Sequence, residues 1–403
     1  MTDDEIRKQT ETLRDYVVDC RRTIHRLAEV GPFEFKTSAF IQSQIEQIGL
    51  PFERAGNTGL IAILDTGHPG PHIALRADID ALPVPENPSN LAGPRVCVSD
   101  NPETCHACGH DAHSSMLLGS MRALVANKDT LCGTVYFCFE AGEENGTGIE
   151  DMLLALSKYP IDTIWGIHVY AALESGKICV DAGPRMAGAA GVEVHFTGKG
   201  GHGSRPDLSI NPVFCAANYL NNLAVAFANQ IDANETVTLG ITTIQGGKVG
   251  NVIPDTADVL GSLRFFNSKE GQKGANIIRE VAEHTAAMHH CKVEFSERTK
   301  VLLGPVTNDE ACSELAKTEL KDILPEGTIS PCEKWFASES FGRYLTIYPG
   351  VFAFLGIKNP DYGSGAQHHN EYFDIDENVL PLGMLATLKY TTAYMKKGCS
   401  TVG

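Results

Sequence analysis

The sequence lacks a long uncharged apolar run anywhere in its 403 residues, so we expect no membrane-spanning helix. It is also short of positive charge, because 33 Lys and Arg face 50 Asp and Glu and leave a formal net charge of -17. Such a surface repels nucleic acid phosphates and anionic lipid, so we expect neither nucleic acid nor membrane as a partner. The opening stretch, MTDDEIRKQTETLRDY, has no apolar signal-peptide core, and we expect a cytoplasmic protein.

Internal repeats and low-complexity tracts are absent as well. Hydrophobic residues make up 43% and charged residues 21%, which is ordinary for a globular protein and argues against disorder. A chain of this length exceeds what one hydrophobic core usually supports, so we expect two domains. The 12 cysteines are scattered, and in a reducing compartment most of them are expected to be buried thiols.

Short apolar runs of the kind found in buried strands mark the first part of the chain. They occupy residues 60–64, 72–78, 135–140 and 163–169. Helical patterns come between and before them, with two helices expected between residues 3 and 50 and a break at Gly31-Pro32. The alternation predicts an α/β domain whose mostly parallel sheet is covered by helices.

The pattern changes near Gly183 and then reads strand, helix, strand, strand, helix, strand. Asn211-Pro212 is a typical helix opening within it. This order is the split βαβ pattern of a ferredoxin-like α+β module. Because α/β elements resume near Leu303, the module is predicted to be inserted: 1–184 and 298–403 form the catalytic domain, and 185–297 the insertion.

The densest chemical signal is His106-Ala-Cys108-Gly-His110-Asp111-Ala-His113. Thiolate, imidazole and carboxylate are all metal ligands. Gly109 allows the turn that lets Cys108 and His110 point at one centre. His106 and His113 are expected to make only supporting hydrogen bonds.

Three further signals lie in other segments. Glu143-Glu144 follows the strand VYFCFE, so that one carboxylate can bind metal while the other stays free to move a proton. His168 ends TIWGIHV, and His369 lies in GSGAQHHNEYF, where it is favoured over His368 by the phase of the downstream motif. Ligands from distant segments are typical of a catalytic centre.

With their surroundings, these motifs resemble the M20 metallopeptidases. The resemblance is closest to the aminoacylase and amidohydrolase branch, which includes indole-3-acetyl-amino-acid hydrolases and hippurate hydrolases. It runs from about residue 20 to 390 in the family's order, through LRADIDALP, HACGHDAHSSMLLGSMRAL, EENGTG, GIHV, GKGGHGSRPDLSINPV, GGKVGNVIPDTADVLGSLRFF, ASESF and HHNEYFDIDE. So many ordered motifs make it specific.

The resemblance implies two divalent metal ions per subunit, held by Cys108, His110, Glu144, His168 and His369. Cys108 stands where sister branches carry a bridging aspartate, so its thiolate is expected to bridge the ions. Zn, Mn, Co and Ni all suit such a donor set. Glu143 is implied as the general base, which takes a proton from the attacking water and delivers it to the leaving amine. Asp80 is implied to orient a ligand from behind.

The resemblance also implies roles in the inserted module, which would act as a lid and as the interface of a homodimer. His202 would help to stabilise the oxyanion. Asn251 and Arg264 are candidates for holding a substrate carboxylate. For Arg264 an ordinary ion pair at a strand end is an equal alternative.

The predicted function is a binuclear-metal amidohydrolase of the aminoacylase type that cleaves N-acyl amino acids or similar small amides. A dipeptidase or carboxypeptidase of the same family and a non-catalytic metal-binding protein are the alternatives. Cys105-x-x-Cys108 also fits half of a structural zinc site or a redox pair, but no second cysteine pair at zinc spacing follows. Ser340 and the loop 363–371 depart from the family pattern and are expected to affect substrate preference.

Overall fold

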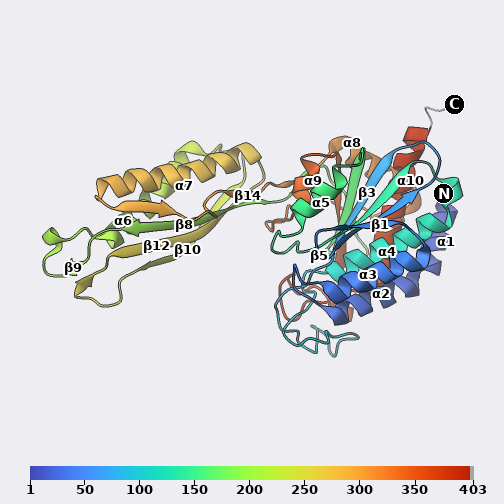
Figure 1. Cartoon of the computed structure of the whole chain (residues 1–403), viewed down its shortest axis with the longest axis horizontal. Coiled ribbons are helices and arrows are strands. Elements are labelled where there is room, and N and C mark those ends of the chain that lie inside the picture. Colours follow the sequence, from blue (N-terminus) through green and yellow to red (C-terminus); the bar gives the residue numbers. More distant parts are fainter. Residues whose placement is uncertain (400–403) are drawn as a thin grey trace. The chain divides into compact units, whose positions relative to one another are not determined.

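The computed structural model describes residues 1–399 and divides them into two compact units (Figure 1). The larger unit contains residues 1–183, 308–333 and the chain from 343 on, and the smaller contains 184–307 and 334–342. Each has its own core of buried side chains, as domains do. No described helix has both the length and the apolar composition that a membrane crossing needs.

A seven-stranded sheet forms the centre of the larger unit. In spatial order its strands are β1 (Phe52–Ala55), β2 (Gly59–Asp65), β4 (Thr134–Glu140), β3 (His72–Asp78), β5 (Thr163–Glu174), β16 (Gly350–Lys358) and β6 (Ile178–Cys179). The four strands from β4 to β16 are parallel, and the strands outside them are antiparallel to their neighbours. The predicted α/β domain with a mostly parallel sheet is confirmed.

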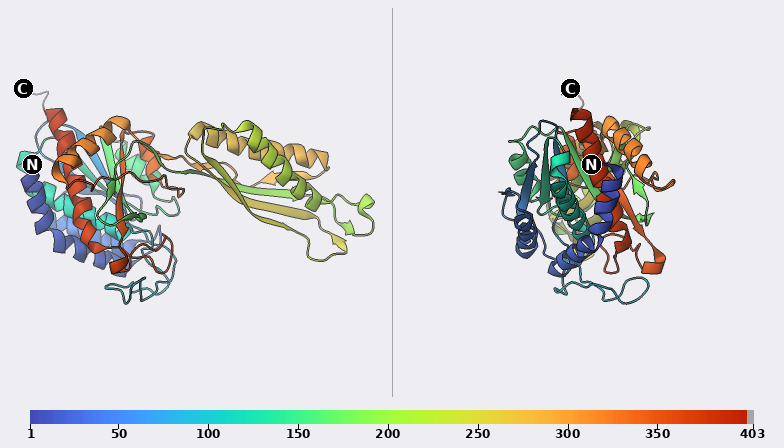
Figure 2. Two further views of the ribbon diagram at one scale, coloured as in Figure 1. Left: turned by 180° about the vertical axis from the view of Figure 1, so that it is seen from behind. Right: turned by 90° about the vertical axis from the view of Figure 1, so that its right-hand side faces the viewer.

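Helices cover both faces of this sheet (Figure 2). The connection from β3 to β4 runs in one direction along the sheet and that from β4 to β5 in the other, so right-handed crossovers place α4 and α5 on opposite faces. The helices of this unit are α1 (Asp3–Thr12), α2 (Arg14–Leu27), α3 (Phe35–Ile48), α4 (His110–Ala126), α5 (Ile149–Leu156), α8 (Glu310–Ile323), α9 (Phe341–Leu345, which begins in the smaller unit) and α10 (Leu380–Cys399), with short 3-10 turns at Lys128–Thr130, Pro360–Tyr362 and Glu377–Val379.

The N-terminal region differs from the prediction of two helices, because α1 and α2 are separate helices that meet at Leu13. No Gly or Pro marks this break, so the sequence gives no signal for it. Gly31-Pro32 does separate α2 from α3, as predicted.

The smaller unit has a four-stranded antiparallel path in the order β10-β12-β8-β13. Two helices connect strands of this path along the chain. This is the ferredoxin-like arrangement that was predicted. Its elements are β8 (Gly188–Thr197), β9 (Gly201–His202), a 3-10 turn (Pro206–Leu208), α6 (Pro212–Gln230), β10 (Val237–Gly246), β11 (Val252–Ile253), β12 (Thr256–Phe265), α7 (Ser268–Met288), β13 (Lys292–Phe295) and β14 (Val301–Leu303). The Asn211 side chain caps α6, which begins at Pro212.

The smaller unit extends beyond the predicted insertion of residues 185–297. It continues to Thr307, because β14 adds to β8 outside the four-strand path. It also takes in residues 334–342, since Trp335 bridges Met186. The short strands β7 (Gly183–Met186) and β15 (Val306–Asn308) pair where the chain passes between the units. These long-range pairings explain why sequence pattern alone placed the boundary too early.

Candidate metal centre

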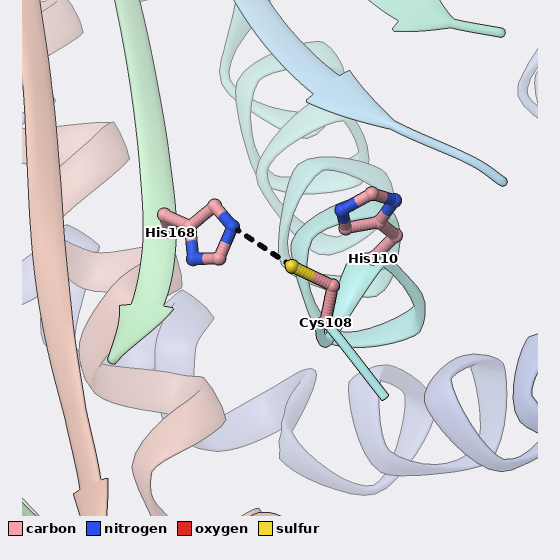
Figure 3. Close-up of side chains that lie close together, drawn as sticks. All are labelled: Cys108, His110 and His168. Carbon is pink, nitrogen blue, oxygen red and sulfur yellow. Dashed lines mark hydrogen bonds between the residues drawn. The ribbon is translucent and has the colours of Figure 1, made fainter. Parts of the chain in front are cut away.

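Cys108, His110 and His168 lie together in the larger unit (Figure 3). His168 points from β5 toward Cys108, and its Nε2 lies 3.6 Å from the Cys108 Sγ. Cys108 and His110 flank Gly109, whose φ of 92° is in the left-handed region. A Cβ at Gly109 would lie 2.3 Å from the Val169 Cγ2, so only glycine fits this turn. The turn brings both donors to one centre.

Glu144 and His369 extend the cluster. The His369 Nε2 lies 3.3 Å from the Glu144 Oε1, and donor atoms of Cys108, Glu144 and His369 all lie within 4.8 Å of one another. His369 has a φ of 61°, which is rare for a residue with a side chain and is often retained for function. Cys108 belongs to this group and to the group with His110 and His168, so its sulfur lies close to both sets of donors.

Two of the imidazoles are held with Nε2 directed at the cluster. The His110 Nδ1 lies 3.1 Å from the Asp80 Oδ1, and this carboxylate accepts a hydrogen bond from the ring N–H. The His168 Nδ1 donates to the backbone carbonyl of Val169 at 2.6 Å. In both rings Nε2 is therefore the nitrogen that faces the cluster, and the Asp80 carboxylate lies against the Nδ1 of His110.

Two buried atoms at the centre of the cluster make no hydrogen bond within the described chain, the His110 Nε2 and the Glu144 Oε1. They lie 3.8 Å apart. Buried polar atoms are rarely left without partners, because each costs free energy. A cation between them would satisfy both, so the residues present fit a metal ion.

Protons compete with metal at this cluster. Burial, helped by the nearby Glu144, raises the pKa of the Cys108 thiol well above its usual range. Burial opposes charge on His110, but Asp78 and Asp80 outweigh it and raise the pKa of this imidazole. Metal binding therefore has to displace protons from both groups.

Glu143 lies beside the cluster without being enclosed by it. One of its carboxylate oxygens lies within 4.8 Å of ligand atoms of His110 and Glu144. It is partly exposed, whereas Cys108, His110 and His168 are buried. A carboxylate in this position can reach both the cluster and a solvent-borne substrate.

Asp78 and His113 approach the cluster from behind. His113 donates from Nδ1 to the Asp78 Oδ1 at 2.7 Å, and its Nε2 accepts from the Val169 N–H at 2.9 Å. Because both nitrogens are used, His113 is a supporting residue, as expected, although Asp78, His110 and His113 also have the spacing of a metal site. Sequence reasoning missed Asp78, and its place in LRADIDALP at the end of a buried strand was the available signal.

His106 and His368 do not belong to any of the donor groups found among the described residues. Burial lowers the pKa of each to about 3, so both are neutral. The His368 Nε2 accepts from the Ala171 N–H at 3.1 Å, whereas the neighbouring His369 faces Glu144. This contrast favours His369 as the ligand of the pair.

His202 and Asn251 lie together in the smaller unit. His202 on β9 pairs with Val252 on β11, and the Asn251 carbonyl accepts from the Gly203 N–H at 2.8 Å. The His202 Nδ1 accepts from the Ser204 N–H at 3.1 Å, so a neutral ring carries its proton on Nε2. The exposed His202 side chain can therefore donate a hydrogen bond.

Arg264 lies near the end of β12 that is farther from Asn251. There it pairs with Ala189 and donates to the Ser338 hydroxyl. At about 3.3 Å per residue, the strand separates it from Asn251 by more than ~20 Å, so the two cannot hold one carboxylate within the same unit. No carboxylate of the described chain forms an ion pair with Arg264, and burial lowers its pKa. The ordinary ion pair considered as its alternative is thus not found.

The profile of peptidase family M20/M25/M40 matches residues 74–390. An IAA-amino acid hydrolase (ILR1-like 4) of Arabidopsis thaliana is 32% identical over 94% of this chain and 86% of its own length. Thermostable carboxypeptidase 1 of Saccharolobus solfataricus is also 32% identical, over 95% of this chain and 96% of its own.

The crystal structure of a dinuclear metal binding M20 peptidase from Bacillus subtilis superposes with a TM-score of 0.81 at 27% identity, and the match covers 96% of this chain and 99% of that one. The fold, the gathered donor residues and these matches agree, and they leave the non-catalytic alternative without support. The chain belongs to the peptidase family M20/M25/M40 and is a hydrolase of amide bonds.

Proposed function

We propose that this enzyme is a binuclear-metal amidohydrolase that cleaves the amide bond of N-acyl amino acids or related small conjugates. The proposal is supported above all by the gathering of a thiol, three imidazoles and a carboxylate, with Glu143 beside them. The similarity to an IAA-amino acid hydrolase favours an acyl conjugate as the substrate.

Cys108, His110, Glu144, His168 and His369 are the proposed ligands. When bound, a pair of divalent ions would lower the pKa of a water molecule and polarise the substrate carbonyl. Glu143 then takes a proton from the attacking water on its carboxylate and delivers it to the leaving nitrogen. His202 donates from Nε2 to the developing oxyanion. Asn251 or Arg264 holds the substrate carboxylate, with the Arg264 guanidinium offering two parallel donors.

A hydrolysis screen tests this proposal directly. The enzyme, reconstituted separately with Zn, Mn, Co and Ni, is incubated with N-acyl amino acids and with dipeptides that carry a free amine. Release of amino acid from the acyl conjugates alone is the expected result. Failure to cleave any acyl conjugate in any metal form would refute the proposal.

A dipeptidase or carboxypeptidase activity is the second candidate, favoured by the similarity to a carboxypeptidase. The same screen separates the two functions, because the catalytic groups are shared and only the acyl side differs. Cleavage of dipeptides in preference to acyl conjugates would support this candidate. Ser340 is buried and donates to Glu339, so the proposed effect of this position on preference would be indirect.

We also propose that the enzyme is a homodimer formed through the smaller unit, which acts as a lid. β10 is an edge strand of its sheet, and edge strands offer unpaired backbone groups to a partner. On α6, Phe214 and Val225 are 69% and 63% exposed and lie three turns apart on one face. Light scattering at micromolar concentration should give the mass of a dimer, and Phe214→Asp should weaken it.

A cytoplasmic location is part of the proposal. Ten cysteines of the described chain are free, eight of them buried, whereas Cys132 is disulfide-bonded. A majority of free thiols suits a reducing compartment. Fractionation of cells that express the enzyme at its native level should place its activity with the cytoplasmic proteins, and activity outside the cytoplasm would contradict this assignment.

A further inference from the structure

Glu34 is a buried carboxylate that its own helix does not use. It occupies the N-cap position of α3, yet its side chain makes no capping hydrogen bond. The Glu29 Oε2 does this instead, accepting from the backbone N–H groups of Lys36 and Thr37 at 2.8 and 2.9 Å. The start of α3 is therefore stabilised without any contribution from the Glu34 carboxylate.

The Glu34 carboxylate turns toward the loop that carries Glu143. Its Oε1 accepts from the Gly142 N–H at 2.7 Å, and its Oε2 accepts from the Thr58 hydroxyl at 2.8 Å. The side chain is fully buried, and burial raises its pKa. Removing a carboxylate from water is costly, and two donors offset only part of that cost. Such a placement calls for a reason beyond local folding.

The loop of residues 141–148 rests on the turn that leads to Glu34. Asn145 donates from its side-chain amide to the Gly31 carbonyl at 2.6 Å. A Cβ at Gly31 would lie 2.5 Å from the Gly142 Cα, so the two backbones are in direct contact there. The turn and the loop thus fit together without room for a side chain between them.

The backbone is held on both sides of Glu143. The Gly142 N–H before it is bound by Glu34, and the Glu144 N–H after it is bound by the Asp80 Oδ2 at 3.1 Å. Both acceptors are buried carboxylates from other segments. The Gly142 carbonyl in turn accepts from the Thr147 N–H at 3.0 Å, so the peptide group before Glu143 is held as well as the one after it, and the direction in which the Glu143 side chain leaves the loop is restricted.

We propose that Glu34 is a positioning residue for Glu143, which it aims by holding the Gly142 N–H. The inference rests on the proposed function, in which Glu143 is the general base. A base must be held within about 0.5 Å of its working position, and a misplacement of about 1 Å can cost 10²-fold in rate. Glu34 acts on turnover through geometry and does not touch the substrate.

The test compares variants of two acidic residues at the start of the same helix. Metal-replete Glu34→Ala should lose about 10²-fold in kcat, with KM changed less than about threefold. Glu34→Gln should recover most of the loss, because its amide oxygen can still accept from Gly142. Glu29→Ala removes only the helix cap, so it should lower Tm but keep kcat near the wild-type value.

The metal content of each variant is measured alongside, and it should not change in Glu34→Ala because Asp80 still holds Glu144. Equal kcat losses in Glu34→Ala and Glu29→Ala, or a loss that only follows lost metal, would overturn the inference. If Glu34→Ala fails to fold, Glu34→Leu and Glu29→Leu take their places, because leucine fills the space but offers the Gly142 N–H no acceptor, and indistinguishable kcat values would overturn the inference. Full activity of Glu143→Gln would instead refute the proposed function itself.

Discussion

His110 lies between Asp80, 3.1 Å from its Nδ1, and Glu144, 3.8 Å from its Nε2. The first contact is a hydrogen bond that orients the ring, and the second is a separation between two buried atoms that make no hydrogen bond, with His369 3.3 Å from the same Glu144 oxygen. The His110 Nε2 is thus placed to bind a cation that would lie between it and the Glu144 carboxylate. Asp80 also accepts from the Glu144 N–H, so one side chain fixes two proposed ligands.

Replacement of Asp80 by Ala should therefore weaken metal binding by about 10- to 100-fold, as loss of an orienting partner usually does. Competition with a chromogenic chelator measures the affinity. Asp80→Asn is the matched variant, because its carbonyl can still accept from His110, and it should fall between Ala and wild type. Wild-type affinity in Asp80→Ala would contradict the assigned role.

Metal binding should release protons, and its affinity should rise with pH. The cause is the raised pKa of Cys108, since a buried thiol must lose its proton to become a ligand. Titration calorimetry in two buffers of different ionisation enthalpy counts the protons released. Cys108→Ser should release fewer than wild type and bind metal more weakly. Equal proton release in the two proteins would exclude the thiol as a ligand.

His368 and His369 provide a matched pair of neighbouring imidazoles. His369→Ala should lower the metal content from two ions to about one per chain with little change in Tm of the metal-free protein, because the side chain is 53% exposed. His368→Ala should instead keep the metal content and lower the Tm of the metal-free protein, since it leaves the Ala171 N–H without its acceptor. Elemental analysis and thermal unfolding distinguish them, and the opposite pattern would exchange their roles.

His25 should make stability depend on pH. Burial and Arg21 oppose its charge, but hydrogen bonds to Asp111 and Glu86, at 2.8 Å each, raise its pKa. A raised folded-state pKa stabilises fully below the unfolded value of about 6.5, and this contribution is lost as pH rises through the folded value.

Near pH 5.5 the free energy of unfolding of the metal-free wild type should therefore be higher than that of His25→Gln by roughly 3 kcal/mol. This is the cost of leaving the buried carboxylates that pair with His25 without their partner. Urea unfolding from pH 5.5 to 9 measures the difference, which should shrink on the alkaline side. A difference that grows with pH would show that His25 is neutral in the folded protein.

Local pattern was enough to predict the parts of the site that lie close together in the sequence. Cys108 and His110 are two residues apart, and the intervening glycine indicates the turn that brings them together. Strand periodicity likewise predicted the sheet, although β5 continues to Glu174, so that His168 lies within the strand and not at its end.

The supporting contacts could not be predicted, because they join segments far apart in the chain. Glu34 reaches Gly142 across 108 positions, and His113 and Asp78 are 35 apart. Nothing in the local composition at Glu34 distinguishes it from Glu29, which caps the helix. Asn251 and Arg264 show the opposite case, because they are close in the sequence but the length of β12 separates them in space.

The most direct test of the central claim is to measure turnover and metal content of Glu143→Gln in the same preparation. The substitution keeps size and removes the proton acceptor, while all five proposed ligands remain. We expect Glu143→Gln to keep the wild-type metal content and to lose about 10²- to 10⁴-fold in kcat. Wild-type turnover, or a loss of turnover that tracks a loss of metal, would contradict it.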